Sequence, residues 1–149
     1  MLDLGTVEAD PKKLNEGSYF EIWREPDASI NGRPISEPQA DKAWVLVVPF
    51  GIAYERALDD ARRPFAERLR TKTVTDDDLR KIQGQALARS TFRGCGNISM
   101  RGEAVVWSEA KAVELMTDER WIRLREFVMW AASNRAASAA REEEEAKGN

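Results

Sequence analysis

The sequence predicts an α+β fold that is mainly α, with a small N-terminal β-hairpin followed by a bundle of about four to five helices. Two observations predict it. Apolar residues alternate in residues 18–24 and form a β-branched and aromatic run at 43–48, and from Gly51 they recur at helical spacing. A chain of 149 residues can bury roughly two-thirds of its unfolded surface. We therefore expect one globular domain, residues 18–137, between a mobile arm at 1–17 and a solvated acidic tail at 138–149.

The sequence predicts two strands joined by a loop. Residues 18–24 alternate with aromatic side chains on both faces, and residues 43–48 end at Pro49. We expect these two strands to pair as a hairpin. Residues 25–41 contain three prolines and the dipeptide Asn31-Gly32, so this stretch is predicted to be a loop with its turn at Asn31-Gly32.

The first helical stretch runs from Gly51 to Leu69 and carries Pro64 in its middle. A proline inside a helix removes a hydrogen bond and clashes with the preceding turn, so a kink or a break into two helices is expected there.

The next helix is predicted to start at Thr75. A capping hydroxyl followed by three aspartates suits the positive end of a helix dipole. Gly84 in its interior would allow another helix to approach closely. The helix should end by Arg93, and residues 94–102 are expected to form a flexible linker.

The segment from Trp107 to Ala137 holds three of the five tryptophans. Ser108 predicts the start of a short helix ending near Met116, and Thr117 the cap of a longer second helix. The second helix is apolar over a wide arc, so one hypothesis is that part of it meets another chain. The alternative is that these aromatic side chains are core. The candidate partner-binding residues are Trp107, Trp121, Phe127 and Trp130.

Composition argues against several classes of function. With 23 basic and 26 acidic residues, the net charge of −3 gives no electrostatic basis for binding nucleic acid or an anionic membrane. The chain has no histidine, which is the commonest general base and transition-metal ligand. A single cysteine, Cys95, cannot form an internal disulfide, and no signal peptide or membrane span is visible. We predict a cytoplasmic, non-enzymatic protein without catalytic, metal-binding or cofactor-binding residues.

Two motifs could suggest chemistry, and each has a simpler explanation. Three consecutive aspartates, 76–78, could bind a hard metal ion, but the helix dipole explains them and no second carboxylate cluster completes the oxygen ligands. The segment Gly94-Cys95-Gly96 could be a reactive loop, but no histidine is present to activate the thiol.

The order of these features resembles the tail assembly chaperones of long-tailed bacteriophages. In that family a helical core precedes an aromatic residue, a glycine-containing linker, a strand-like segment, a short capped helix and a longer helix. The corresponding segments here are Phe92, residues 94–102, residues 103–107 and residues 108–118, and the similarity covers roughly residues 44–137. Two positions depart from the family pattern: Phe92 stands where tryptophan is expected, and no asparagine-like residue precedes Tyr54.

This resemblance implies a chaperone that binds and solubilises the tape-measure protein during tail morphogenesis. Such a protein would act in the host cytoplasm and be absent from the mature virion. The resemblance also allows self-association into oligomers and contact with the tail-tube protein. The alternative function is that of a small phage-encoded interaction or inhibitor protein acting on a host factor, which would need neither oligomers nor a tape-measure partner.

Overall fold

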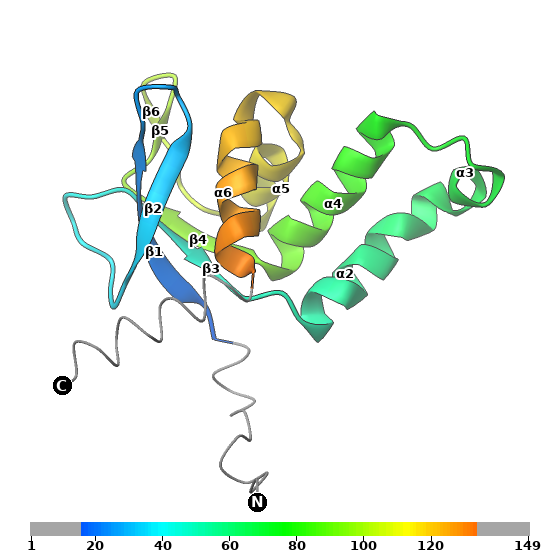
Figure 1. Ribbon diagram of the computed structural model, residues 1–149, viewed down its shortest axis with the longest axis horizontal. Helices are drawn as coiled ribbons and strands as arrows, with labels where there is room; N and C mark the ends of the chain where they lie inside the picture. The colour runs from blue at the N-terminus through cyan, green and yellow to red at the C-terminus, as the bar shows by residue number, and fades with distance from the viewer. Residues whose placement is uncertain (1–15, 134–149) are drawn as a thin grey trace, which may run out of the picture.

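The computed structural model describes residues 16–133 as an antiparallel sheet with helices packed on one face and a helical arm projecting from them (Figure 1). The main sheet has the strand order β2-β1-β3-β4. Its strands are β1 (Ser18–Arg24), β2 (Ile30–Ile35), β3 (Trp44–Val47) and β4 (Phe92–Gly96), and a separate small hairpin contains β5 (Ser99–Met100) and β6 (Glu103–Ala104). The predicted α+β class is confirmed. The N-terminal arm and the acidic tail predicted from the sequence fall almost entirely outside the described residues.

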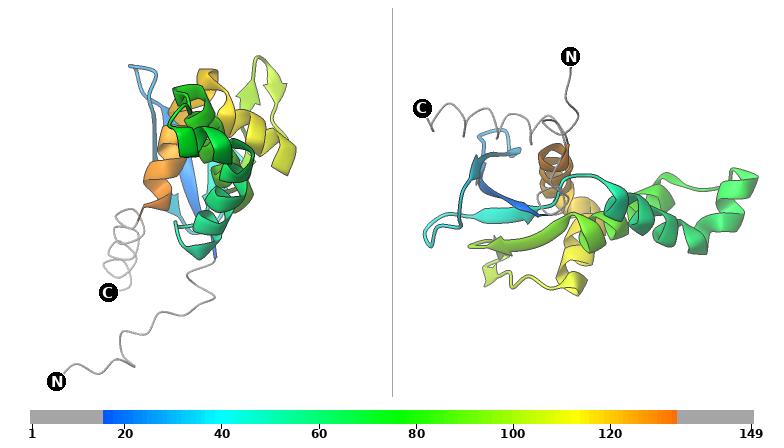
Figure 2. Two further views of the ribbon diagram at one scale, coloured as in Figure 1. Left: turned by 90° about the vertical axis from the view of Figure 1, so that its right-hand side faces the viewer. Right: turned by 90° about the horizontal axis from the view of Figure 1, so that it is seen from below.

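Five α-helices and two short 3-10 turns complete the described chain. They are α2 (Ile52–Arg62), α3 (Ala66–Thr71), α4 (Asp76–Ser90), α5 (Glu109–Thr117) and α6 (Ile122–Ala132), with η2 (Arg63–Phe65) and η3 (Glu119–Trp121) between them. We call α2, α3 and the first half of α4 the helical arm. Seen from below, the sheet and the helical arm lie at opposite ends of the molecule (Figure 2).

The prediction that residues 25–41 form a loop is wrong, because this stretch contains β2. The turn lies at residues 25–29, where the Ser29 carbonyl accepts the Glu25 N–H, and not at Asn31-Gly32. β2 is the edge strand, so Pro34 does not interrupt a central ladder. Gly32 is needed because an added Cβ would lie 2.6 Å from Phe127 Cζ. The two predicted strands do pair antiparallel, but β2 intervenes between them in the chain.

The predicted linker at residues 94–102 is also wrong, since it contains the end of β4 and the β5 strand. In β4 the Phe92 and Cys95 side chains are buried against the helices. The glycines of β4 serve close packing: a Cβ at Gly96 would lie 2.7 Å from Trp44 Cζ2.

The helix starts predicted from capping residues are confirmed at two places. Thr75 accepts the Asp78 N–H in a reciprocal capping box, and Ser108 accepts the Lys111 N–H. The third predicted cap is one residue off, because Asp118 rather than Thr117 accepts the Arg120 N–H at the start of η3.

The structure also tests two predictions about helix interiors, one at Pro64 and one at Gly84. Pro64 lies in η2 and divides the first helical stretch into α2 and α3. Gly84 lies where α4 meets α5: an added Cβ would overlap the Met116 carbonyl and lie 2.7 Å from Thr117 Cγ2. The predicted close approach of a helix at Gly84 is therefore confirmed.

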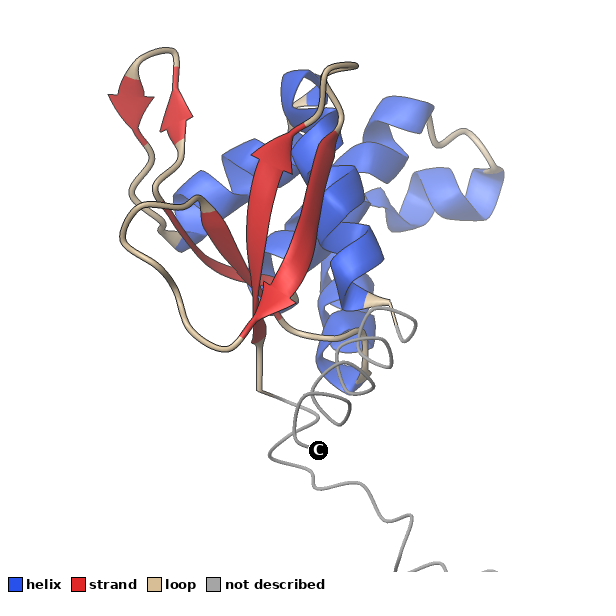
Figure 3. Ribbon diagram, turned by 60° about the vertical axis from the view of Figure 1, so that its left-hand side comes forward, coloured by secondary structure: helices blue, strands red, loops and turns tan. Residues whose placement is uncertain are grey.

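The core lies between the inner face of the sheet and helices α4, α5 and α6. Its largest fully buried apolar side chains are Phe20, Phe92, Leu87, Met116, Val45, Val47 and Val128. In the described part of the chain the outer face of the sheet carries no helix (Figure 3). That face presents Tyr19, Trp23 and Trp44, which explains why the first strand is aromatic on both sides.

Two aspartates at helix starts make the protein sensitive to acid. The backbone N–H of Thr75 and the guanidinium of Arg68 hold the pKa of the Asp78 carboxyl below its ordinary value of 3.8. Arg120 lowers the pKa of Asp118 to about 2. When the pKa of a carboxyl is lower in the folded chain than in the unfolded chain, its ionised form stabilises the fold at any pH above the unfolded-state pKa. This stabilisation is lost as the pH falls from the unfolded-state pKa through the folded-state pKa.

We therefore expect the melting temperature to fall between about pH 5 and about pH 3, and to fall less in Asp78→Asn, which cannot gain that proton. Asp76→Asn is the matched control, because Asp76 is exposed and makes no ion pair within residues 16–133. The measurement is thermal unfolding by circular dichroism at both pH values. An equal fall in Asp78→Asn and the wild type would contradict this role of Asp78.

Candidate functional site

The structure brings together two of the four candidate partner-binding residues, Phe127 and Trp130 on α6. Their ring centroids lie 5.6 Å apart, and Phe20 of β1 meets both rings edge-on at 6.0 and 6.4 Å. Phe127 is only 4% exposed, whereas Trp130 is 48% exposed. The buried rings of Phe20 and Phe127 therefore support the exposed ring of Trp130 at the surface.

Beside this pair lies a hollow of about 250 Å³, which we call the α6–β2 hollow. It is lined by Phe127 and Trp130 from α6 and by Ile30 at the start of β2, with Arg123 and Glu126 also on its wall. Because Gly32 has no side chain, α6 can approach β2 closely enough for Phe127 to form the wall of the hollow. Ser29 and Asn31 complete its lining. The apolar side chains of Ile30, Phe127 and Trp130 in this hollow are suited to an apolar side chain of a partner.

The other two candidates lie elsewhere. Trp107, just before α5, is partly buried with the Arg93 guanidinium 5.1 Å from the centre of its ring. Trp121, at the end of η3, is partly buried with Arg120 at 5.7 Å. Both indole Nε1 atoms are buried without a hydrogen-bond partner in the described chain. Neither residue lines the α6–β2 hollow.

Ile30 is the apolar residue of the hollow that the sequence did not indicate. The neighbouring Asn31-Gly32 and Pro34 are typical of a turn, so they hid the strand that carries Ile30. A second exposed tryptophan, Trp23, lies on the outer face of the sheet, is 39% exposed, and donates its Nε1–H to Glu25.

The two motifs that could suggest chemistry have structural roles. Burial raises the pKa of the Cys95 thiol to about 11, so at neutral pH this thiol is protonated. Asp77 pairs with Arg80 and Lys81, and Asp78 with Arg68, so two of the three consecutive aspartates are occupied by ion pairs. Within residues 16–133 no three His, Cys, Asp or Glu side chains are placed to hold a metal ion.

None of the helices within residues 16–133 is both long enough and apolar enough to cross a membrane.

The model of a protein family described as "YdaY prophage protein" matches residues 50–149. The match begins just after β3 and includes every helix from α2 to α6, and therefore the α6 wall of the hollow. No curated protein and no solved structure matches the chain.

Proposed function

The chain belongs to the YdaY prophage protein family, and from this premise we propose that it is a tail assembly chaperone that binds and solubilises the tape-measure protein during tail morphogenesis. Membership of a prophage family fits a protein made for phage assembly. The family is described only as a prophage family. The surface of α6 supports the more specific function.

The observation that carries the proposal is the exposed Trp130 ring above the α6–β2 hollow. A client that exposes apolar side chains on helices is recognised by an apolar groove that receives a few of them as anchors. Tryptophan is enriched among residues that dominate such interfaces. The net charge of −3 leaves shape and apolar contact as the basis of recognition.

The proposal includes the setting in which the protein would act. A chaperone of this kind works in the host cytoplasm on clients that are insoluble alone, and it is not expected in the mature virion. Weak binding sites on several copies would together hold a long client, so self-association and contact with the tail-tube protein belong to the same proposal.

The test is co-expression of the tagged protein with the tape-measure protein of the same prophage, scored by the amount of soluble client that co-elutes. Trp130→Glu should reduce co-elution at least tenfold, because loss of an anchoring tryptophan costs about 2 kcal/mol or more. Trp23→Glu is the matched control: it also adds a charge at an exposed tryptophan, but on the outer face of the sheet.

Two outcomes would contradict the proposal. Equal loss in the two variants would mean that the α6–β2 hollow is not the binding site. A client that stays insoluble while the wild-type protein elutes alone as a monomer would favour the alternative of an inhibitor acting on a host factor.

A further inference from the structure

A second depression lies on the other side of α6, between this helix and the helical arm, with a volume of about 430 Å³. Three arginines line it: Arg62 from α2, which pairs with Asp59, Arg80 from α4, which pairs with Asp77 and Glu119, and Arg125 from α6. We call it the arginine groove. The lining residues come from α2, α3, α4 and α6, whose arrangement is seen in Figure 1.

Arg125 is the unusual member of the arginine groove, because it is only 9% exposed. No carboxylate of residues 16–133 lies within ion-pair distance of its guanidinium. The negative charges of Glu119 and Glu126 act on Arg125, but both side chains are largely exposed. The guanidinium of Arg80 adds a like charge. Burial and Arg80 both lower the pKa of Arg125. The guanidinium keeps some contact with solvent through the groove, but a cation that is largely buried and has no ion pair within residues 16–133 is still costly, so its retention needs a reason.

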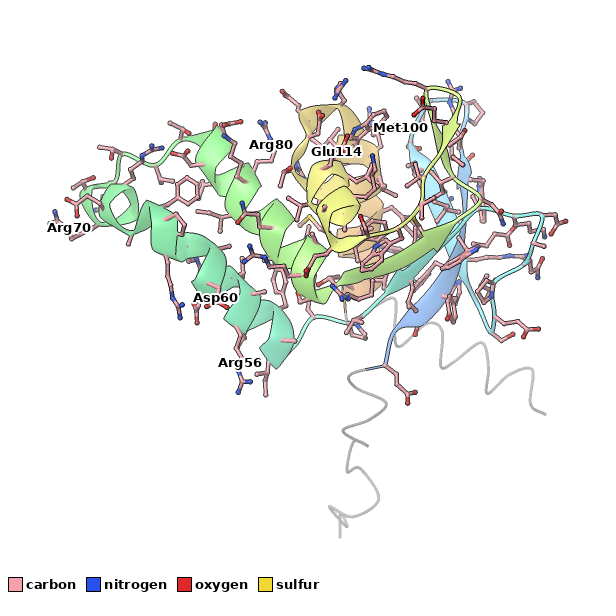
Figure 4. All side chains as sticks on the ribbon, turned by 180° about the vertical axis from the view of Figure 1, so that it is seen from behind. Arg56, Asp60, Arg70, Arg80, Met100 and Glu114 are labelled. Atoms are coloured by element: carbon pink, nitrogen blue, oxygen red, sulfur yellow. The ribbon has the colours of Figure 1, made fainter. Side chains whose placement is uncertain are left out.

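One structural role is visible but does not account for the whole side chain. The carbonyl groups at the end of α5 accept hydrogen bonds from both arginines: Met116 O from Arg125 Nη1 at 3.4 Å, and Thr117 O from Arg80 Nε at 3.2 Å. Arg80 lies where α4 passes α5 (Figure 4). The Met116 bond is long and uses one of the five N–H groups of Arg125, and its other donors have no acceptor within the described residues.

The rest of the groove is suited to more than a free anion. Leu58, Leu69 and Leu79 line it beside the arginines, and Leu79 is 47% exposed. A small inorganic anion would pair with the guanidinium groups but leave these leucines in water. A helix with an acidic side chain next to aliphatic ones would satisfy both kinds of surface.

From this arrangement we infer that the arginine groove binds a glutamate or aspartate side chain on an amphipathic helix of a partner protein, with Arg125 as its buried counter-ion. This site is independent of the tape-measure proposal, because the arginine groove and the α6–β2 hollow lie on opposite sides of α6. The ligand is thus a carboxylate side chain that lies next to aliphatic side chains on one face of a helix.

The test uses the full chain and two blocked, helix-forming peptides of leucine, alanine and glutamate, identical except that the second carries glutamine at every glutamate position. Titration calorimetry should show that the glutamate peptide binds about tenfold tighter. Arg125→Met should abolish this preference while the melting temperature stays the same or rises, since a buried charge is replaced by an apolar side chain of similar size. Arg56→Met is the matched control: it removes an exposed arginine of α2 that lines neither depression, and it should leave the preference unchanged.

Three results would overturn the inference. Equal binding of both peptides, or binding of neither, would show that the arginine groove does not select a carboxylate. An Arg125→Met variant that melts lower and keeps the preference would leave Arg125 as a cap for α5 alone. Binding of the glutamate peptide only after Glu142–Glu145 are changed to glutamine would mean that the acidic stretch of this chain itself occupies the groove.

Discussion

Gly84→Val is expected to lower the free energy of unfolding by about 3 kcal/mol, because α4 and α5 touch at this position. An added Cβ would overlap the Met116 carbonyl oxygen and crowd the Thr117 side chain. The clash is with backbone, so it cannot be relieved by a rotamer change alone. Moving the end of α5 away would also displace the carbonyls that accept hydrogen bonds from Arg80 and Arg125.

Gln85→Val is the control for the Gly84 prediction. It places the same β-branched residue at the next position of α4, which is only partly buried, and should cost only about 0.5 kcal/mol through helix propensity. Urea unfolding followed by circular dichroism measures both variants. If the two variants lose equal stability, α4 and α5 can separate without cost, and the close approach at Gly84 is not part of the stable core.

The helix starts could be predicted from the sequence because their causes are local. Thr75 and Ser108 cap their helices through backbone N–H groups three residues away, so a short stretch of sequence contains the whole signal. Pro64 divides its helix for an equally local reason.

Strands β2 and β4 could not be predicted in the same way. Gly32 and Gly96 are typical of loops, yet in the structure both lie in strands because large side chains from other elements cover them. Phe127 lies over Gly32 from 95 positions later in the chain, and Trp44 lies over Gly96 from 52 positions earlier. Such contacts exist only once the chain is folded, and no local preference shows them.

The candidate sites show the same division between local and long-range causes. The wide apolar arc of α6 led to Phe127 and Trp130, which the structure places side by side. Helical spacing does not show that Ile30 completes the hollow, because Ile30 comes from the edge strand. Nothing in the local sequence distinguishes Arg125 from the exposed Arg123, but in the structure Arg125 is buried beside Arg80 of α4 and Met116 of α5.

Phe127→Ala is expected to have the largest effect on stability, lowering the free energy of unfolding by about 4 kcal/mol. The Phe127 ring is almost completely buried, meets Phe20 and Trp130, and fills the space above Gly32. Truncation to alanine would leave a cavity between α6 and the sheet. Trp130→Ala should cost less, about 2 kcal/mol, because about half of that side chain is already in water.

The double variant Phe127→Ala/Trp130→Ala tests whether the two rings form one unit. Since the rings contact each other, their separate losses should exceed the combined loss by about 1 kcal/mol, as measured by urea unfolding. Additive losses would mean that Phe127 does not hold Trp130 in place. A Phe127→Ala variant as stable as the wild type would mean that α6 is not anchored on β1 and β2 through this ring. The α6–β2 hollow would then not be preformed, and the proposal that Trp130 anchors a client there would lose its structural basis.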